Sequence, residues 1–289
     1  MNKNSILNWT LLLILSIIWG SSFILMKKGL IGFNYLEVSF FRLIIAFLIL
    51  IPFVKNSLRN IKRKHIFPLL VVSILGTVFP AILFANAQVY IDSAVAGMLN
   101  ALTPIFTVIS GFYLFNQKIN LKTKGIGTII GFVGTYILLS PNGEDGFIKY
   151  KMMIILATIC YAISINTIKN KLLSLKPLEI TTISSLFAVL PAFFYFLQLG
   201  SENTIRKIQH NLDSFYYLII LGIVCTSIAI ILFNFLIKRS SALFASSTTY
   251  LIPVFALIWG IFDQETIHKN EVLGIGIVLM GVFIMNYEN

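Results

Sequence analysis

One apolar stretch with a proline in its middle occurs twice in the chain. Residues 94–115 read AVAGMLNALTPIFTVISGFYLF, and residues 242–262 read ALFASSTTYLIPVFALIWGIF. At an offset of 149 positions, Pro104 aligns with Pro253. Each stretch is long enough to cross a bilayer, which takes about 20 mostly apolar residues. Because proline removes a backbone donor and frees a carbonyl that lipid does not satisfy, we expect both stretches to face the inside of a helix bundle.

The whole chain is strongly apolar. Of its 289 residues, 57% are hydrophobic and only 11% are charged, and the mean hydropathy is +0.90. This composition is typical of a membrane protein and excludes a soluble globule of this size. We therefore predict an all-α integral membrane protein with ten transmembrane helices. The predicted spans are 7–27, 35–54, 67–90, 94–115, 121–140, 151–169, 178–199, 215–237, 242–262 and 271–287.

The basic residues lie in short clusters between the apolar segments and give the chain a net charge of +11. Such clusters set orientation in a membrane and form no stripe for nucleic acid, so the expected partners are the lipid bilayer and a small-molecule substrate. With the N-terminus in the cytoplasm, the inner loops hold 14 Lys and Arg residues and the outer loops hold seven. We therefore predict a multi-pass protein of the cytoplasmic (inner) membrane with both termini in the cytoplasm. The longest loop, 200–214, is then external, and we expect it to be the most disordered segment.

The duplication extends beyond the proline-containing spans. At an offset of 142, Trp19 aligns with Tyr161, and at an offset of 149 residues 76–77 align with residues 225–226. The chain therefore divides into two predicted repeats of five spans each, residues 1–143 and residues 144–289. An odd number of spans per repeat turns the second copy upside down relative to the first. Two inverted five-helix repeats around a shared site near the midplane are typical of secondary transporters.

Several motifs occur in an order and spacing that resemble those of a known family. They are Trp19-Gly20-Ser21, Arg42, Pro104 and Pro253, DQET at 263–266, and the paired glycines in the last span of each half. Over essentially the whole chain, this set resembles the EamA family of the drug/metabolite transporter superfamily. The resemblance implies an inner-membrane carrier with a central cavity lined by the first, third, fourth, sixth, eighth and ninth helices. It also implies export of amino acids, other small metabolites or drugs by alternating access through that cavity.

The chain departs from this family at the end of the fourth span. Members commonly carry a glutamate there, whereas this chain has Asn116 and Gln117, and the second copy keeps Glu265. The resemblance therefore implies no symmetric pair of carboxylates in this chain.

Fifteen residues are predicted to line the substrate cavity, because each places a polar, aromatic or helix-breaking group inside a span. In hydrocarbon such groups need partners, so they point inward and either bind solute or hold helices together. Arg42 is the only charge well inside a span, and it either snorkels to the headgroups or contacts substrate. A few polar groups among Phe, Leu and Ile suit a mostly apolar or zwitterionic solute. The candidates are Trp19, Ser21, Ser22, Arg42, Asn86, Asn100, Thr103, Pro104, Tyr161, Ser164, Asn166, Asn234, Thr249, Tyr250 and Pro253.

Other classes of function have little support in the sequence. His65, His210 and His268 fall in different loops, and no metal-binding or phosphate-cradling motif occurs. We therefore expect no enzyme, no catalytic residue, no metal and no cofactor. A non-transporting membrane scaffold or sensor built on the same helices is the alternative. We expect a monomer or a homodimer, because the GxxxG sequence at 127–131 either packs within the chain or forms a dimer face.

Overall fold

The computed structural model describes residues 3–117, 121–139 and 147–286, and these residues form helices and connections without a β-strand. The all-α prediction is confirmed. Eight helices or interrupted helices in this part of the chain are long and apolar enough to cross a membrane. They are Ile6–Gly32, Tyr35–Leu58, Arg63–Gln88, Ser93–Phe115, Ile148–Lys171, Pro177–Leu199, Leu212–Arg239 and Ala242–Phe262.

The predicted spans 121–140 and 271–287 fall on two further helices, α7 and α15, which are not among these eight. α7 (Leu121–Leu139) contains a shorter apolar segment, Gly125–Ile137, and α15 covers Lys269–Asn286. Each of the ten predicted spans therefore overlaps a helix, whereas a count of ten membrane crossings stays a prediction.

The remaining elements follow one another as helices and short helical interruptions, with bounds α1 Lys3–Gly32, α2 Tyr35–Leu58, α3 Arg63–Ser73, η1 Ile74–Val78, α4 Phe79–Gln88, α5 Ser93–Asn100, α6 Thr103–Phe115, α8 Ile148–Lys171, α9 Pro177–Leu199, α10 Ser201–His210, α11 Leu212–Gly222, η3 Ile223–Ile228, α12 Ala229–Arg239, α13 Ala242–Ser246, η4 Ser247–Tyr250 and α14 Ile252–Phe262.

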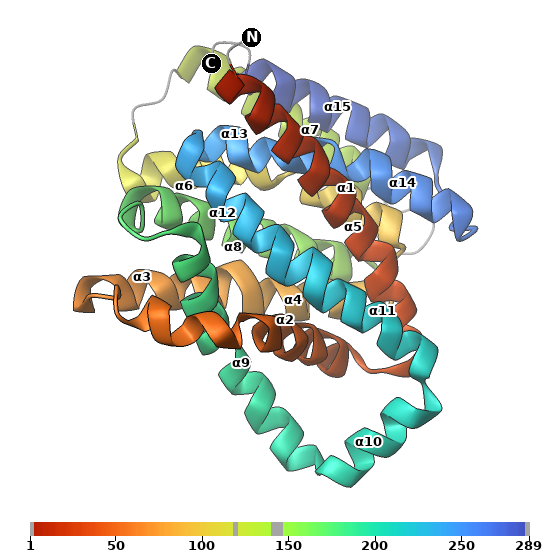
Figure 1. The fold of residues 1–289 in the computed structure, drawn as a ribbon. Coiled ribbons are helices and arrows are strands. Elements are labelled where there is room, and N and C mark those ends of the chain that lie inside the picture. The colour runs from red at the N-terminus through yellow and green to blue at the C-terminus, as the bar shows by residue number, and fades with distance from the viewer. Residues whose placement is uncertain (1–2, 118–120, 140–146, 287–289) are drawn as a thin grey trace.

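Helices from the two ends of the sequence lie side by side in one bundle (Figure 1). α1 packs against α11 and α14, α2 packs against α9, α8 packs against α4 and α6, and α7 runs along α15. Each of these contacts joins the first half of the chain to the second. α1 begins and α15 ends at the same end of the bundle (Figure 1). The span formed by α5 and α6 is the most buried of the eight, with 78% of its central window inside the protein.

Both proline-containing spans are interrupted next to the proline. α5 ends at Asn100 and α6 restarts with Pro104 in its first turn, while α13, η4 and α14 form a second broken span with Pro253 at the restart. Both prolines are buried. The carbonyls near the breaks receive side-chain donors, since Thr103 Oγ1 lies 2.8 Å from the Asn100 carbonyl and Thr249 Oγ1 lies 2.8 Å from the Ser246 carbonyl. The carbonyl that Pro104 frees, that of Asn100, thus has a donor inside the protein, as a membrane requires.

Two further spans contain a π-helical turn at aligned positions. η1 lies between α3 and α4 and includes Gly76 and Thr77, and η3 lies between α11 and α12 and includes Cys225 and Thr226. A π-turn adds one residue to a helical turn and is frequent at functional sites. Within η3, Thr226 Oγ1 donates to the Leu221 carbonyl at 2.8 Å. Pro80 follows η1 by two residues and Gly222 directly precedes η3, although the sequence analysis did not use either to predict these turns.

The expectation that 200–214 is the most disordered segment is wrong. Residues 201–210 form α10, and Lys207 Nζ on this helix pairs with Glu37 Oε2 at 2.6 Å. The Glu37 side chain also accepts from the Asn34 backbone N–H at 2.8 Å in a capping box at the start of α2. α10 is therefore fixed to the first half of the chain by a largely buried carboxylate.

Glycines hold α7 and α15 together at close range. A Cβ added at Gly281 would lie 2.6 Å from both the Gly127 carbonyl oxygen and the Gly131 nitrogen, and one at Gly134 would lie 2.6 Å from the Val278 nitrogen. The glycine face at 127–131 therefore packs within the chain, as one of the two alternatives predicted, and it is not free for a second copy.

We expect Gly281→Ala to lower the midpoint of thermal unfolding by several degrees, because the new methyl group meets the backbone of α7 and such overpacking costs about 1–3 kcal/mol. Gly276→Ala is the matched control on the same helix. A Cβ at Gly276 meets nothing within 4 Å, and alanine is the better helix former. Thermal unfolding of the purified protein in detergent measures both variants, and equal midpoints would contradict the close packing.

Candidate functional site

A cavity of about 100 Å³ lies between the helices of the two halves, and nine of the fifteen predicted residues line it. The nine are Trp19, Ser22, Arg42, Asn100, Thr103, Tyr161, Ser164, Asn234 and Thr249. The sequence analysis did not predict the other lining residues for the cavity, which are Phe23, Met26, Val72, Gly76, Thr77, Phe84, Ile165, Ile168, Ser184, Thr226, Ile230 and Phe233. The six expected helices all contribute to the wall, and α2 and α9 contribute as well, through Arg42 and Ser184.

Most polar atoms on the wall are already engaged by the protein. Trp19 Nε1 donates to the Cys225 carbonyl at 3.0 Å, so Trp19 presents an apolar ring, which packs edge-on against Phe233. Asn234 Nδ2 donates to Thr181 Oγ1 at 2.8 Å, while Asn234 Oδ1 has no partner among the described residues. The wall is therefore mainly aromatic and aliphatic, with few groups free to meet a solute.

Of the described residues that line this wall, Arg42 alone carries a charge. Its Nε donates to Thr226 Oγ1 at 2.6 Å, and no Asp or Glu in the described part of the chain pairs with it. The Arg42 side chain therefore turns toward the cavity, and its contact with a substrate stays a prediction.

The other six candidates lie away from the cavity wall. Ser21 accepts a hydrogen bond from Trp259 Nε1 at 2.8 Å, on the side of α1 that faces α14. Asn166 Nδ2 donates to the Thr107 carbonyl at 2.8 Å, which turns this amide toward α6. These contacts join helices. The full set outside the wall is Ser21, Asn86, Pro104, Asn166, Tyr250 and Pro253.

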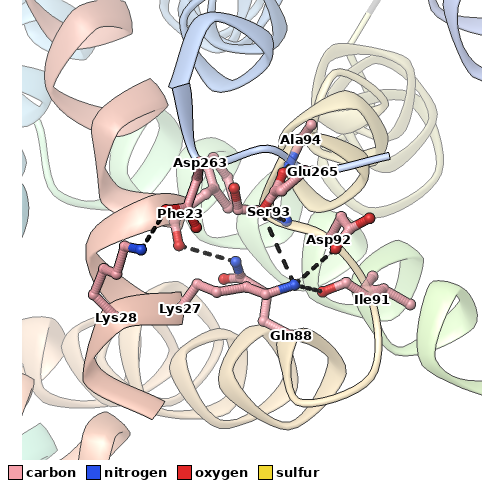
Figure 2. Close-up of polar contacts among 10 residues, drawn as sticks. All are labelled: Phe23, Lys27, Lys28, Gln88, Ile91, Asp92, Ser93, Ala94, Asp263 and Glu265. Carbon is pink, nitrogen blue, oxygen red and sulfur yellow. Dashed lines mark hydrogen bonds and ion pairs between the residues drawn. The ribbon is translucent and has the colours of Figure 1, made fainter. Parts of the chain in front are cut away.

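A cluster of charged side chains lies near the C-terminal end of α1 (Figure 2). Lys27 Nζ lies 2.8 Å from Asp92 Oδ1 and 3.9 Å from Glu265 Oε1, and Lys28 pairs with Asp263. We call these five residues the α1-end cluster. Lys28 and Asp263 belong to different halves of the chain, so the cluster ties the halves together at this end.

Glu265 is the most enclosed carboxylate of the cluster, with a side chain only 3% exposed. Its two oxygens accept from the backbone N–H groups of Ser93 at 2.8 Å and Ala94 at 3.0 Å (Figure 2). These groups begin α5, where a helix leaves its first N–H groups without internal partners and favours negative charge. A residue of the second half therefore caps a helix of the first half.

The opposite end of the bundle lacks this arrangement among the described residues. Gln117 N donates to the Gly111 carbonyl at 3.0 Å, much as Glu265 N donates to the Gly260 carbonyl at 2.9 Å, so Gln117 takes the position equivalent to Glu265. Gln117 Nε2 then donates to Asn166 Oδ1 at 3.1 Å, a neutral contact between α6 and α8. The departure from the family pattern noted at Asn116 and Gln117 thus replaces a charged contact by a neutral one.

Lys169, which aligns with Lys27, also meets only neutral groups among the residues with described positions. It donates to the Ile237 carbonyl at 3.0 Å and to the Ser240 carbonyl. Elsewhere in the described residues, no group of three His, Cys, Asp or Glu side chains is placed to hold a metal ion, and Cys160 and Cys225 are free and buried.

Comparison with known proteins identifies the family. The EamA-like transporter family matches residues 8–140 and again residues 148–287. The chain belongs to the EamA-like transporter family. This EamA protein is accordingly a multi-pass membrane protein, and the family resemblance seen in the sequence is confirmed.

Relatives of this EamA protein match over nearly its whole length. An uncharacterized transporter of Archaeoglobus fulgidus is 25% identical, with 96% of this chain and 98% of the relative covered. The uncharacterized transporter YoaV of Bacillus subtilis is 22% identical, with 94% of each covered. The uncharacterized inner membrane transporter YedA of Escherichia coli is 25% identical, with 94% of this chain and 88% of the relative covered.

A solved crystal structure has the same fold as this EamA protein. It superposes with a TM-score of 0.60 at 12% identity and covers 95% of this chain and 96% of its own. At this identity the likeness supports the arrangement of helices alone.

We expect Glu265→Ala to lower the midpoint of thermal unfolding, because two buried backbone N–H groups lose their acceptor at a cost of about 1–3 kcal/mol. Glu202→Ala, which changes an exposed carboxylate on α10, is the control and should shift the midpoint much less. Thermal unfolding in detergent reports both. If the two variants lost the same stability, Glu265 would not be holding the halves together.

Proposed function

We propose that this chain is a secondary transporter that exports amino acids or other small metabolites across the cytoplasmic membrane by alternating access. The observation that supports it most directly is the cavity between the two halves, which contains Arg42 among its described lining residues. A solute bound there contacts helices of both halves. Secondary transporters place their solute sites at the interface of repeats, next to interrupted helices. The breaks at α5–α6 and at α13–η4–α14 both contribute cavity residues, Asn100, Thr103 and Thr249.

The paired irregularities support the proposed inverted repeat. The two broken spans carry aligned prolines, and the two π-turns carry the aligned pairs at 76–77 and 225–226. Because both the proline breaks and the π-turns recur at aligned positions, the two halves, residues 1–143 and 144–289, are best explained as two copies of one five-helix unit. Five spans per copy place the second upside down relative to the first.

The α1-end cluster supplies a gate in this proposal. A path to the outside opens only if the contacts of Lys28 with Asp263 and of Glu265 with the start of α5 separate, since both join the two halves. In the predicted orientation this end faces outward. The name of the Escherichia coli relative, an inner membrane transporter, supports the cytoplasmic membrane as the location.

The size of the cavity favours small metabolites over drugs. Its volume of about 100 Å³ lies below the roughly 300–1,000 Å³ of sites that hold drug-sized ligands. Aromatic rings on the wall suit a solute with an apolar body.

We expect cells that express the wild-type chain to accumulate at least one small metabolite in the medium several-fold above cells with an empty vector. Asn100→Trp and Thr249→Trp, which fill the cavity from opposite halves, should abolish the difference. Leu197→Trp is the control, since this α9 side chain is 61% exposed on the outside of the bundle. Mass spectrometry of the medium measures export.

Identical media for the wild type, both cavity variants and the empty vector would contradict export. Thermal unfolding of each variant establishes that it is folded. A partner that binds the wild type, with no flux of any solute, would favour the scaffold or sensor alternative.

Orientation of the repeats is tested by thiol labelling in a variant whose Cys160 and Cys225 are replaced by alanine. Asn116→Cys and Thr266→Cys both lie at exposed connections that follow aligned spans. For an inverted repeat with both termini in the cytoplasm, a membrane-impermeant reagent should label Thr266→Cys in intact cells. It should label Asn116→Cys only after permeabilisation, and labelling of both from one side would refute the inversion.

A further inference from the structure

Arg42 is a charged residue within the predicted span of α2, and no acidic side chain of the described residues forms an ion pair with it. It lies seven residues into α2, about 10 Å from the start of the helix at roughly 1.5 Å per residue. Glu37, the acid on the same helix, is occupied by Lys207 at 2.6 Å. An unpaired charge at this depth is expensive and marks a functional site.

The guanidinium of Arg42 is held by one nitrogen and leaves the other two free for a solute. Nε donates to Thr226 Oγ1 at 2.6 Å, and Thr226 Oγ1 in turn donates to the Leu221 carbonyl at 2.8 Å within the π-turn η3. The terminal nitrogens make no hydrogen bond to the described residues. They form the planar fork that matches the two oxygens of a carboxylate, which binds more strongly than a neutral acceptor.

In the part of the chain that the structure describes, the rest of the cavity wall carries no negative charge. No Asp or Glu is among its lining residues, and Trp19, Phe23 and Phe84 surround the space with apolar surface. A cationic amine entering here meets the charge of Arg42 without a carboxylate to balance it, whereas an anion is attracted. An uncharged solute leaves the two free nitrogens of Arg42 without a charged acceptor.

We infer that the cavity recognises the carboxylate of a small solute with an apolar body, and that Arg42 is the residue that binds it. This inference rests on the proposed transport function and adds the class of solute. Two classes of solute carry such a carboxylate, namely monocarboxylates and zwitterionic amino acids, and the test below distinguishes between them.

Four compounds with one branched apolar body provide the test: 4-methylpentanoate, 4-methylpentanamide, 4-methylpentylamine and leucine. Ligand-induced thermal stabilisation of the purified protein measures binding, because a ligand that binds only the folded state raises the midpoint. We expect 4-methylpentanoate to bind about tenfold or more tightly than the amide, and the amine to give no shift. Leucine that binds as tightly as 4-methylpentanoate identifies amino acids as the source, and leucine that does not bind identifies monocarboxylates.

Variants at Arg42 decide whether this residue carries the preference. Arg42→Gln should remove the tenfold preference for the carboxylate over the amide, and Arg42→Lys should keep part of it, because an ammonium retains the charge without the fork. Arg206→Gln removes an exposed cation on α10 and should leave the preference unchanged. Equal binding of acid and amide by the wild type, or an unchanged preference in Arg42→Gln, would overturn the inference.

Failure of this inference is distinct from failure of the proposed function. Export that is blocked by Asn100→Trp but insensitive to Arg42→Gln keeps the transporter and rejects the carboxylate site. Absence of export in the wild type rejects the transporter itself.

Discussion

A backbone carbonyl freed inside the bilayer must find a donor within the protein, and this constraint governs the structure around Pro104 and Pro253. Pro104 frees the carbonyl of Asn100, and the Thr103 hydroxyl donates to it, while near Pro253 the Thr249 hydroxyl donates to the Ser246 carbonyl, about one turn before the break. These polar groups have to be kept from lipid, so the broken spans lie inside the bundle, and the span of α5 and α6 is the most buried. The same requirement brings Asn100, Thr103 and Thr249 to one cavity. The cavity therefore lies beside the interrupted helices, which the fold has to bury because their polar backbone groups cannot face lipid.

The sequence predicted the helical class, eight helices long and apolar enough to cross a membrane, and the interruptions at Pro104 and Pro253, because hydropathy and proline act locally. It could not separate neighbouring residues that face different helices. Ser21 and Ser22 differ by about 100° around α1, and only tertiary contacts decide that Ser22 lines the cavity while Ser21 meets Trp259. Asn166 was likewise predicted for the cavity from its polarity, but it bonds to α6. The π-turns and helix α10 were not predicted, although Pro80 lies just after η1 and α10 has an acid in its first turn and Lys207 and His210 in its last. The ion pair of Lys207 with Glu37 then fixes α10 to the bundle.

The two ends of the bundle differ in the kind of contact that joins the halves. Glu265 and the pair of Lys28 with Asp263 supply charge-assisted contacts at one end, while Gln117 and Asn166 supply a neutral one at the other. Hydrogen bonds with an ionised partner are roughly twice as strong as neutral ones. In the proposed inverted repeat, the conformation closed at the α1 end is therefore more stable than its mirror image. For an exporter, the preferred resting state is then closed toward the outside and able to receive solute from the cytoplasm.

Arg42 disfavours closure of the cavity in the proposed cycle when no solute is bound. A cavity that closes around a lone guanidinium must remove the water that solvates it, which is costly in a low-dielectric interior. A carboxylate on the two free nitrogens neutralises the charge and replaces that water, so closure becomes easier when solute is present. The hydrogen bond to Thr226 places this switch on the π-turn of the eighth span, in the half opposite to α2. Binding of an anion at Arg42 would thus act directly on the junction between the halves, which is the surface that has to rearrange for the gate to open.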